Sequence, residues 1–206
     1  MIRRGAAALA AASLLFACAS PAPAPERRAD AARLMDELMS GRYPIGEPFR
    51  LSDAAGRRVA LSDFEGRLVL LYFGFASCPD VCPTDLATIA EALRALGASA
   101  SEVQPVLITL DPERDSPAML REYAQAFHPS FIALTGSEEE IRRVATSFKV
   151  FYEKVPVRGG QTYVIDHTAY TFLLDRGGKF VILFPPGTAA ERMVEMLREQ
   201  LALLEN

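Results

Sequence analysis

The segment Leu68–Pro83, LVLLYFGFASCPDVCP, decides the fold of this chain. Its first part, Leu68 to Phe73, is apolar without interruption, which predicts a central β-strand covered on both faces. A helical pattern of apolar residues follows from Thr84 to Leu96. Cys78 and Cys82 therefore lie where a buried strand passes into the N-terminus of a helix.

The position of these two thiols has chemical consequences. Unpaired backbone N–H groups and the positive end of the helix dipole stabilise a thiolate relative to a thiol. Cys78 and Cys82 are i and i+4, so if the turn is helical their Cα atoms are about 6 Å apart. That separation permits a disulfide when the pair is oxidised and the binding of one soft metal ion when it is reduced.

The composition limits the class of protein. The chain has 206 residues, half of them hydrophobic, and a net charge of −4. We expect one domain with a sizeable core and find no internal repeat. Nucleic-acid binding requires clustered lysine and arginine, and no basic stripe is present, so nucleic acid is excluded as a partner.

The first residues have the pattern of an export signal. Arg3 and Arg4 precede an apolar stretch, Ala6–Phe16, that is too short to span a bilayer, so residues 1–17 are expected to be a signal peptide. The ending Leu15-Phe16-Ala17-Cys18 resembles a bacterial lipobox, with Phe16 at a position usually held by a small or branched residue. We expect a lipid anchor on Cys18 and a domain in the periplasm or on the outer face of the cytoplasmic membrane. A plain signal peptide or a retained anchor is the alternative.

Cysteine use supports an active role for the remaining pair. Residues 18–40, rich in proline and alanine, suit a tether, and residues 41–206 form the domain. With Cys18 assigned to processing, Cys78 and Cys82 are left. In an exported protein, one close pair of cysteines either forms a local structural disulfide or is active in redox or metal chemistry. A loop this short adds little stability as a staple. We therefore favour a role in redox or metal chemistry for this pair over a structural role.

The patterns along the rest of the chain predict alternating strands and helices. The expected elements are a hairpin over residues 49–61, strands at Val106–Leu110 and Phe131–Leu134, helices from Pro117 to about Phe127 and from Ser137 to near Phe148, a hairpin over residues 169–184, and a helix over Ala189–Leu204. Residues 150–163, which contain Pro156, Gly159 and Gly160, are expected to form a long loop.

This order predicts an α/β class: a layered sheet with a parallel portion, an antiparallel edge pair and an N-terminal β-hairpin extension. The dithiol at the end of the first central strand matches the thioredoxin arrangement. A thioredoxin-type sheet also places the start of the strand after His167 beside the dithiol turn. Two thiolates and an imidazole suit copper, because cysteine favours Cu(I) while imidazole also accommodates Cu(II).

Alternatives remain open at this site. Zinc is the rival metal, although a structural zinc site needs four protein ligands and Cys2His with an open position is a catalytic pattern. His167 could instead be a partly buried histidine with satisfied hydrogen bonds. Four of the other candidates have local explanations as helix-terminal or turn residues: Asp80, Asp111, Asp115 and His128. Asp166 is a further acidic candidate, next to His167.

Several motifs together resemble the Sco/SenC family over about residues 41–200. They are Tyr72-Phe73-Gly74-Phe75, Cys78-Pro79-Asp80-Val81-Cys82-Pro83-Thr84, Val106–Asp115, Phe127-His128-Pro129 and Asp166-His167-Thr168, with Thr168 where serine is common. The resemblance implies a thioredoxin-like fold and copper held by Cys78, Cys82 and His167. It also implies a role in delivering copper to, or reducing the cysteines of, the binuclear CuA centre of cytochrome c oxidase.

Three functions follow as hypotheses. The first is a membrane-tethered copper metallochaperone, which is not primarily an enzyme. Its partners would be the CuA-bearing oxidase subunit and another periplasmic copper chaperone or a thiol reductant. The loop over residues 150–166 would let His167 approach or leave the thiolates.

The second hypothesis is a thiol-disulfide oxidoreductase. Against it, the spacing is C-x3-C in place of C-x2-C, and Asp166-His167 stands where thioredoxins have a cis-proline. The third is a copper or redox sensor that signals through a partner.

Overall fold

The computed structural model describes residues 45–157 and 162–203. The expected signal peptide (1–17), the lipidation site Cys18, the tether (18–40) and the Gly159-Gly160 pair lie outside these residues. None of the described helices is both long enough and apolar enough to cross a membrane.

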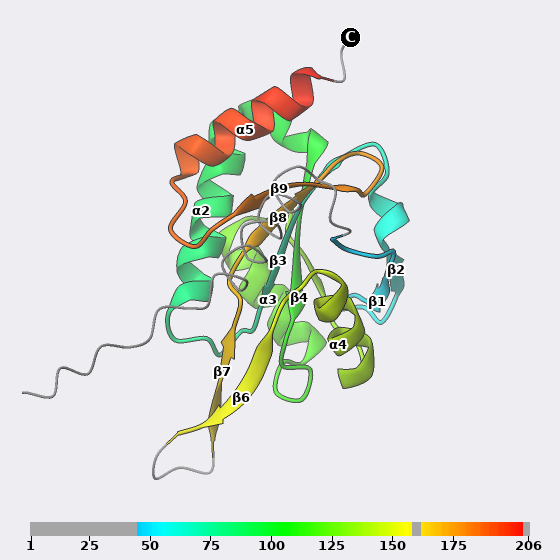
Figure 1. The fold of residues 1–206 in the computed structure, drawn as a ribbon, viewed down its shortest axis with the longest axis vertical. Coiled ribbons are helices and arrows are strands. Elements are labelled where there is room, and N and C mark those ends of the chain that lie inside the picture. Colours follow the sequence, from blue (N-terminus) through cyan, green and yellow to red (C-terminus); the bar gives the residue numbers. More distant parts are fainter. Residues whose placement is uncertain (1–44, 158–161, 204–206) are drawn as a thin grey trace, which may run out of the picture.

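A five-stranded sheet in the order β5-β4-β3-β8-β9 forms the centre of the domain (Figure 1). Strands β3 (Leu68–Gly74), β4 (Val103–Thr109) and β5 (Ile132–Leu134) are parallel. Strands β8 (Thr171–Leu174) and β9 (Phe180–Phe184) are added antiparallel at the other side of β3. Every residue of β3 is buried, as its uninterrupted apolar run predicts for a central strand.

Two of the four described α-helices begin at the caps expected from the sequence. The four are α2 (Val81–Leu96), α3 (Pro117–Phe127), α4 (Glu138–Ser147) and α5 (Ala190–Ala202), with short 3-10 helices η1 (Leu61–Phe64) and η2 (Gly97–Glu102). Ser116 caps α3 ahead of Pro117, and Ser137 forms a capping box with Glu140 at the start of α4. Helix α2 packs along α5 and also touches α3.

Consecutive side chains of β3 identify the helices on each face of the sheet. Tyr72 points to α2, where its hydroxyl donates a hydrogen bond to Asp85. Phe73 points to the opposite face, where its ring centroid lies 5.6 Å from that of Phe148, at the end of α4, and 6.0 Å from that of Phe172. Because neighbouring side chains of a strand alternate between faces, α2 and α4 cover opposite sides of the sheet.

The N-terminal extension is the expected hairpin. Strands β1 (Arg50–Ser52) and β2 (Arg58–Ala60) pair antiparallel, and the Asp53 carboxylate closes the turn by accepting hydrogen bonds from the backbone N–H groups of Ala55 and Arg57. With the sheet and its two helical layers, this confirms the α/β class and the thioredoxin-like order of elements predicted from the sequence.

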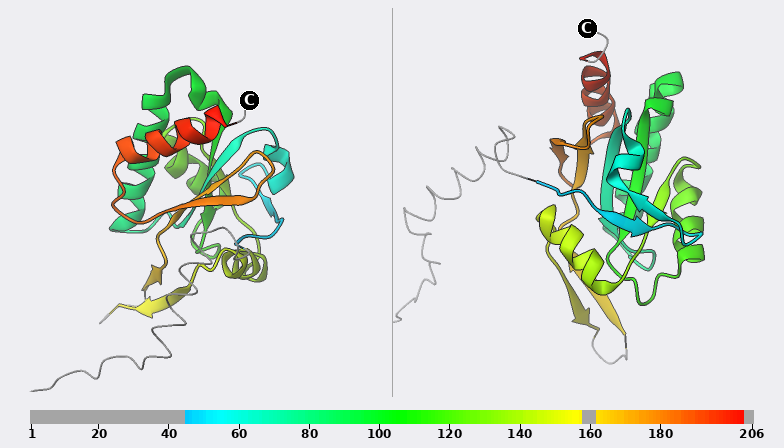
Figure 2. Two further views of the ribbon diagram at one scale, coloured as in Figure 1. Left: turned by 45° about the horizontal axis from the view of Figure 1, so that its top comes forward. Right: turned by 90° about the vertical axis from the view of Figure 1, so that its right-hand side faces the viewer.

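The segment expected to be a long loop is instead a second hairpin, so that prediction was wrong. Strands β6 (Tyr152–Pro156) and β7 (Tyr163–His167) pair antiparallel. The hairpin stands out from the body at the end remote from α5 (Figures 1 and 2). Pro156 is tolerated because β6 and β7 form a two-stranded sheet in which the neighbouring Val157 N–H donates to the Thr162 carbonyl, so an N–H at position 156 would point away from β7.

Candidate metal centre

The turn between β3 and α2 brings the cysteines together without being helical itself. Helix α2 begins at Val81 with Asp80 as its N-cap, so Cys82 lies in the first turn of the helix and Cys78 lies before it. The helical condition attached to the Cα separation in the sequence analysis is therefore not met. The Cys78 N–H donates to the carbonyl of Phe75 at 3.2 Å, which folds the chain back toward the helix.

Gly74, the last residue of β3, makes room for this turn. A Cβ at that position would lie 2.8 Å from Cε1 of Tyr72 and 3.1 Å from Sγ of Cys82. Both distances are too short for an ordinary side-chain contact. Glycine lets the strand pass this close to the sulfur, and a larger residue there would force the Tyr72 ring or Cys82 to shift.

A buried carboxylate stabilises the cysteine turn by accepting hydrogen bonds. Oδ2 of Asp115 accepts a hydrogen bond from the backbone N–H of Ala76 at 3.1 Å and another from Oγ1 of Thr109 at 2.7 Å. Burial raises the pKa of this carboxyl group. The sequence suggested only local turn chemistry for Asp115, and it missed this link between the end of β4 and the cysteine turn.

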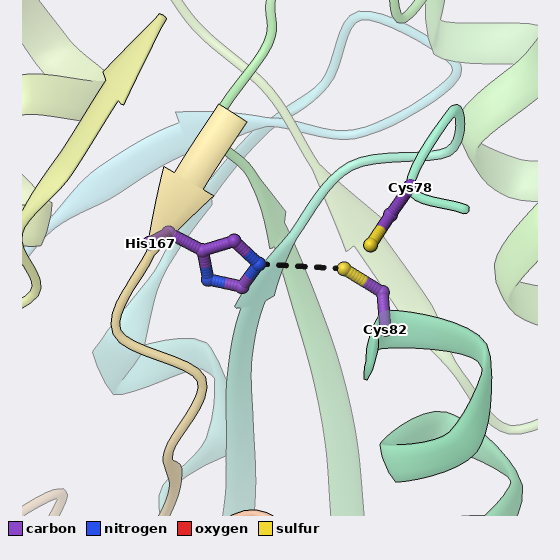
Figure 3. Close-up of side chains that lie close together, drawn as sticks. All are labelled: Cys78, Cys82 and His167. Atoms are coloured by element: carbon purple, nitrogen blue, oxygen red, sulfur yellow. Dashed lines mark hydrogen bonds between the residues drawn. The ribbon is translucent and has the colours of Figure 1, made fainter. Parts of the chain in front are cut away.

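His167, the last residue of β7, brings an imidazole to the two sulfurs (Figure 3). Its Nε2 lies 3.5 Å from Sγ of Cys82, and the ligand atoms of Cys78, Cys82 and His167 all lie within 4.8 Å of one another. Cys82 is fully buried, whereas Cys78 and His167 are half-buried. The rings of Phe75 and Tyr72 meet the imidazole edge-on, with centroids at 5.9 and 6.5 Å.

The hydrogen bond of the second ring nitrogen of His167 determines which ring nitrogen carries the proton. Nδ1 lies 3.2 Å from the carbonyl oxygen of Thr168. Because a carbonyl only accepts, Nδ1 carries the proton when this hydrogen bond forms. Nε2 then has its lone pair free for a metal ion, as in sites where an outer hydrogen bond orients a ligating histidine.

The two thiols differ in acidity. A hydrogen bond from the Cys82 thiol lowers the pKa of Cys78 to about 4. The same interaction with Cys78, together with burial, raises the pKa of Cys82 above its ordinary value. At neutral pH the pair therefore carries one negative charge, and a metal ion bound by both sulfurs must displace the proton of Cys82.

Tyr72 and Asp85 form a polar pair beneath Cys82 that sequence reasoning did not identify. The Tyr72 hydroxyl donates to Oδ2 of Asp85 at 3.1 Å, and both side chains are buried. Burial raises the pKa of Asp85, while burial and the nearby Cys82 and Asp85 raise that of Tyr72. The only sequence signal was an acidic residue, three positions after Cys82, on the apolar face of α2.

The turn-proximal half of the β6–β7 hairpin is fixed to the loop after β4. The Tyr163 hydroxyl donates to Oδ1 of Asp111 at 2.8 Å, and Arg114, which pairs with Asp111, donates to the carbonyl of Tyr163 at 2.8 Å. Nζ of Lys154 lies 2.7 Å from Oε2 of Glu113. These contacts set the position of the strand that ends in His167.

The remaining sequence candidates lie apart from this cluster. Asp80 is exposed, Asp166 is exposed on the hairpin, and Nδ1 of His128 lies 2.7 Å from the Ser130 hydroxyl in a local turn. Among residues 45–157 and 162–203, the group of three or more His, Cys, Asp and Glu side chains close enough to share a metal ion is Cys78, Cys82 and His167.

The fold and this cluster agree with comparisons to known proteins. The SCO1/SenC family model matches residues 38–202. The chain belongs to this family. A SCO2-like protein of Rickettsia prowazekii is 41% identical over 164 residues, which are 79% of this chain and 80% of that protein.

Solved structures similar to this chain include copper-bound ones. ScoI of Bradyrhizobium japonicum with copper bound is 41% identical, matches 76% of this chain and 99% of its own, and has a TM-score of 0.70. Yeast Sco1 with copper bound is 34% identical, matches 78% of this chain and 90% of its own, and has a TM-score of 0.71. The family resemblance and the thioredoxin-like fold predicted from the sequence are thereby confirmed.

Proposed function

We propose that this chain is a copper metallochaperone that binds one copper ion through Cys78, Cys82 and His167. The observation that carries the proposal is the convergence of two sulfurs and one imidazole nitrogen within 4.8 Å of one another. Copper-bound relatives with the same fold support the choice of metal. Thiolate sulfur stabilises Cu(I), and the added imidazole accommodates Cu(II) as well, so the site suits both oxidation states.

Zinc is the weaker proposal for this donor set. A structural zinc site needs four protein ligands, and the described residues bring only three His, Cys, Asp or Glu side chains together here. Copper(I) is commonly satisfied by fewer ligands, and soft sulfur ligands select it. A half-buried site with Cys78 and His167 partly exposed also leaves an approach for an acceptor.

Copper titration tests the metal assignment, and the chain offers a matched control because it has two histidines. We expect the reduced domain to bind one equivalent of Cu(II), with a sulfur-to-copper absorption band and an EPR signal. His167→Ala should lose or alter both signals and lower the affinity for copper, whereas His128→Ala should leave them unchanged. Equal effects of the two substitutions would exclude His167 as a ligand.

The cellular task proposed for this site is assembly of the CuA centre of cytochrome c oxidase. Copper would pass from the Cys2His site to the CuA-bearing subunit, and the partial exposure of Cys78 and His167 supports transfer by direct ligand exchange. The test is the loss of copper from the loaded domain on mixing with the copper-free CuA-bearing domain, followed by the CuA absorption. Tight binding without transfer to that domain would favour a copper sensor.

A second candidate, a thiol-disulfide oxidoreductase, is favoured by the low pKa of Cys78. The Cys78 thiolate would attack one sulfur of an oxidised partner, releasing the other sulfur as a thiolate. Cys82 would pass its proton to the released partner thiolate and then attack Cys78 in the mixed disulfide, leaving a Cys78–Cys82 disulfide and a reduced partner. Rapid turnover that is insensitive to His167→Ala would favour this function over copper delivery.

We also propose that the mature chain is anchored by a lipid on Cys18 in the periplasm or on the outer face of the cytoplasmic membrane. The support is the sequence pattern of residues 1–18. Mass spectrometry of the mature N-terminus tests it, and Cys18→Ser should release the domain from the membrane fraction if the anchor is a lipid.

A further inference from the structure

The β6–β7 hairpin has one face turned to the domain and one turned to solvent. Lys154, Tyr163 and His167 point inward, to Glu113, Asp111 and Cys82 respectively. Because side chains alternate along a strand, their neighbours point outward. The outward set, called the outer face below, consists of Phe151, Glu153, Val155, Val164 and Asp166.

Apolar side chains are concentrated on this hairpin. The described residues contain six exposed large hydrophobic side chains, and Phe151, Val155, Val157 and Val164 are four of them. Phe151 is 80% exposed, and Val155 lies directly across from Val164 in the strand register. Single exposed apolar residues need no explanation, but a group on one small hairpin is typical of a surface that meets a partner.

The outer face also carries an uncompensated pair of acids. Glu153 lies directly opposite Asp166 in the register, and among the described residues neither carboxylate has a hydrogen-bond or ion-pair partner. Like charges at directly opposed positions destabilise a strand pair. The isolated domain is therefore less stable than it would be with a neutral pair, and a basic group supplied from outside would remove that cost.

The outer face is continuous with the metal centre. An open cleft at the base of the hairpin is lined by Phe151, Tyr152, Glu153, Asp166, His167 and Thr168. His167 thus borders the cleft while its Nε2 faces Cys82. A protein bound on the outer face would lie next to a proposed copper ligand, which is where an acceptor must be for direct ligand exchange.

We propose that the outer face is the docking surface for the protein that takes copper from this site, and that this partner presents basic side chains around an apolar patch. The proposal rests on the proposed function of copper delivery. The acid pair argues for such a partner over a second copy of this chain, because a symmetric contact would bring the acid pairs of two copies to the same interface. It also argues against an anionic lipid surface.

Copper transfer to a copper-free, soluble CuA-bearing oxidase domain tests the docking surface. The variants are Glu153→Gln with Asp166→Asn, and separately Phe151→Ser. The matched control is Glu91→Gln with Glu199→Gln, which removes two exposed acids from α2 and α5, outside the β6–β7 hairpin. For each protein the second-order rate constant is measured at several salt concentrations, together with the affinity for copper.

We expect the double acid variant to transfer copper about tenfold more slowly at low salt, with a flatter salt dependence, because electrostatic steering is lost. Phe151→Ser should raise the acceptor concentration needed for half-maximal transfer several-fold. The control should behave as the wild type, and the affinity for copper should be unchanged in all three. The double acid variant should melt at the wild-type temperature or higher, because a repulsive pair is removed.

The outcomes separate the two proposals. If the wild-type protein binds the acceptor but transfers no copper, copper delivery is contradicted. The docking surface is then tested by whether the variants weaken binding to the acceptor. Wild-type transfer with unchanged rates and salt dependence in the outer-face variants would overturn the docking surface alone. Self-association that Phe151→Ser abolishes would assign the face to a second copy and overturn it as well.

Discussion

Nε2 of His167 lies 3.5 Å from Sγ of Cys82, although the two residues are 85 positions apart in the sequence. Cys82 is placed by the first turn of α2, and His167 by the end of a hairpin outside the main sheet. The donor set therefore depends on two separately positioned elements. Changes that move either element should alter copper binding even when no ligand is replaced.

The acidity of Cys78 predicts its reactivity as a function of pH. Only the thiolate is alkylated, and with a pKa of about 4 Cys78 is mostly thiolate at neutral and mildly acidic pH. An ordinary thiol, with a pKa of about 8.5, loses its reactivity as the pH falls through that value. We expect iodoacetamide to modify Cys78 at a nearly constant thiolate fraction down to about pH 5, as measured by peptide mass spectrometry.

Cys82→Ala should raise the pKa of Cys78, because the largest cause of its low value is the hydrogen bond from Cys82. The alkylation profile should then shift to higher pH. His128→Ala, far from the pair, should leave the profile in place. A wild-type profile centred near the ordinary thiol pKa would contradict the charge distribution described for the pair.

Gly74→Ala should disturb the metal centre from the strand side. The new methyl group would lie 3.1 Å from Sγ of Cys82 and 2.8 Å from the Tyr72 ring. We expect a loss of about 1–3 kcal/mol in the free energy of unfolding, because these contacts require overpacking, and weaker copper binding. Gly177→Ala is the control, since its nearest contact is an ordinary 3.4 Å to Asp175. Equal melting temperatures for the two variants would mean that the turn adapts without strain.

The sequence predicted the parts of the fold that have a clear period or cap. The apolar run of β3 and the capping box of α4 each indicate one structure. The pattern of residues 150–163 did not indicate the hairpin that forms there, because Pro156 and the following glycines are typical of a loop. The alternation of β6 and β7 becomes informative only when the two strands are paired, with Pro156 opposite Tyr163 at the last position of the ladder.

The proximity of the ligand side chains was predictable because it follows from the topology of the fold. A thioredoxin-type sheet brings His167 toward the dithiol turn, and the structure does bring the three side chains together. The supporting contacts were not predictable, because they depend on tertiary distances between distant segments. Asp115 reaches the Ala76 N–H from the loop after β4, and Tyr72 meets Asp85 across the interface of β3 and α2.

Asp115→Ala should loosen the cysteine turn. It leaves the Ala76 N–H and the Thr109 hydroxyl without their shared acceptor in a buried place. We expect a loss of about 1–3 kcal/mol in the free energy of unfolding, which is the cost of unsatisfied buried groups. Asp115→Asn keeps an oxygen for both donors and should lose much less. Denaturant unfolding of the two variants checks this, and a loss of equal size in both would point to charge as the property that matters.

Tyr163→Phe should loosen the hairpin that carries His167. The substitution removes the hydrogen bond from the Tyr163 hydroxyl to Asp111, while leaving the ring over Arg114. A loss of about 1 kcal/mol corresponds to roughly fivefold more frequent local opening. Faster amide hydrogen exchange in β6 and β7, with weaker copper binding, is the expected result.

Tyr123→Phe is the matched control for that prediction, because the Tyr123 hydroxyl is buried without a hydrogen-bond partner among the described residues. Removing it should leave exchange in the hairpin unchanged and the stability equal or slightly higher. Unchanged exchange in Tyr163→Phe would mean that the Arg114 and Lys154 contacts hold the hairpin without the hydroxyl. Faster hairpin exchange with unchanged copper affinity would mean instead that the position of His167 does not depend on the Tyr163 contact to the loop after β4.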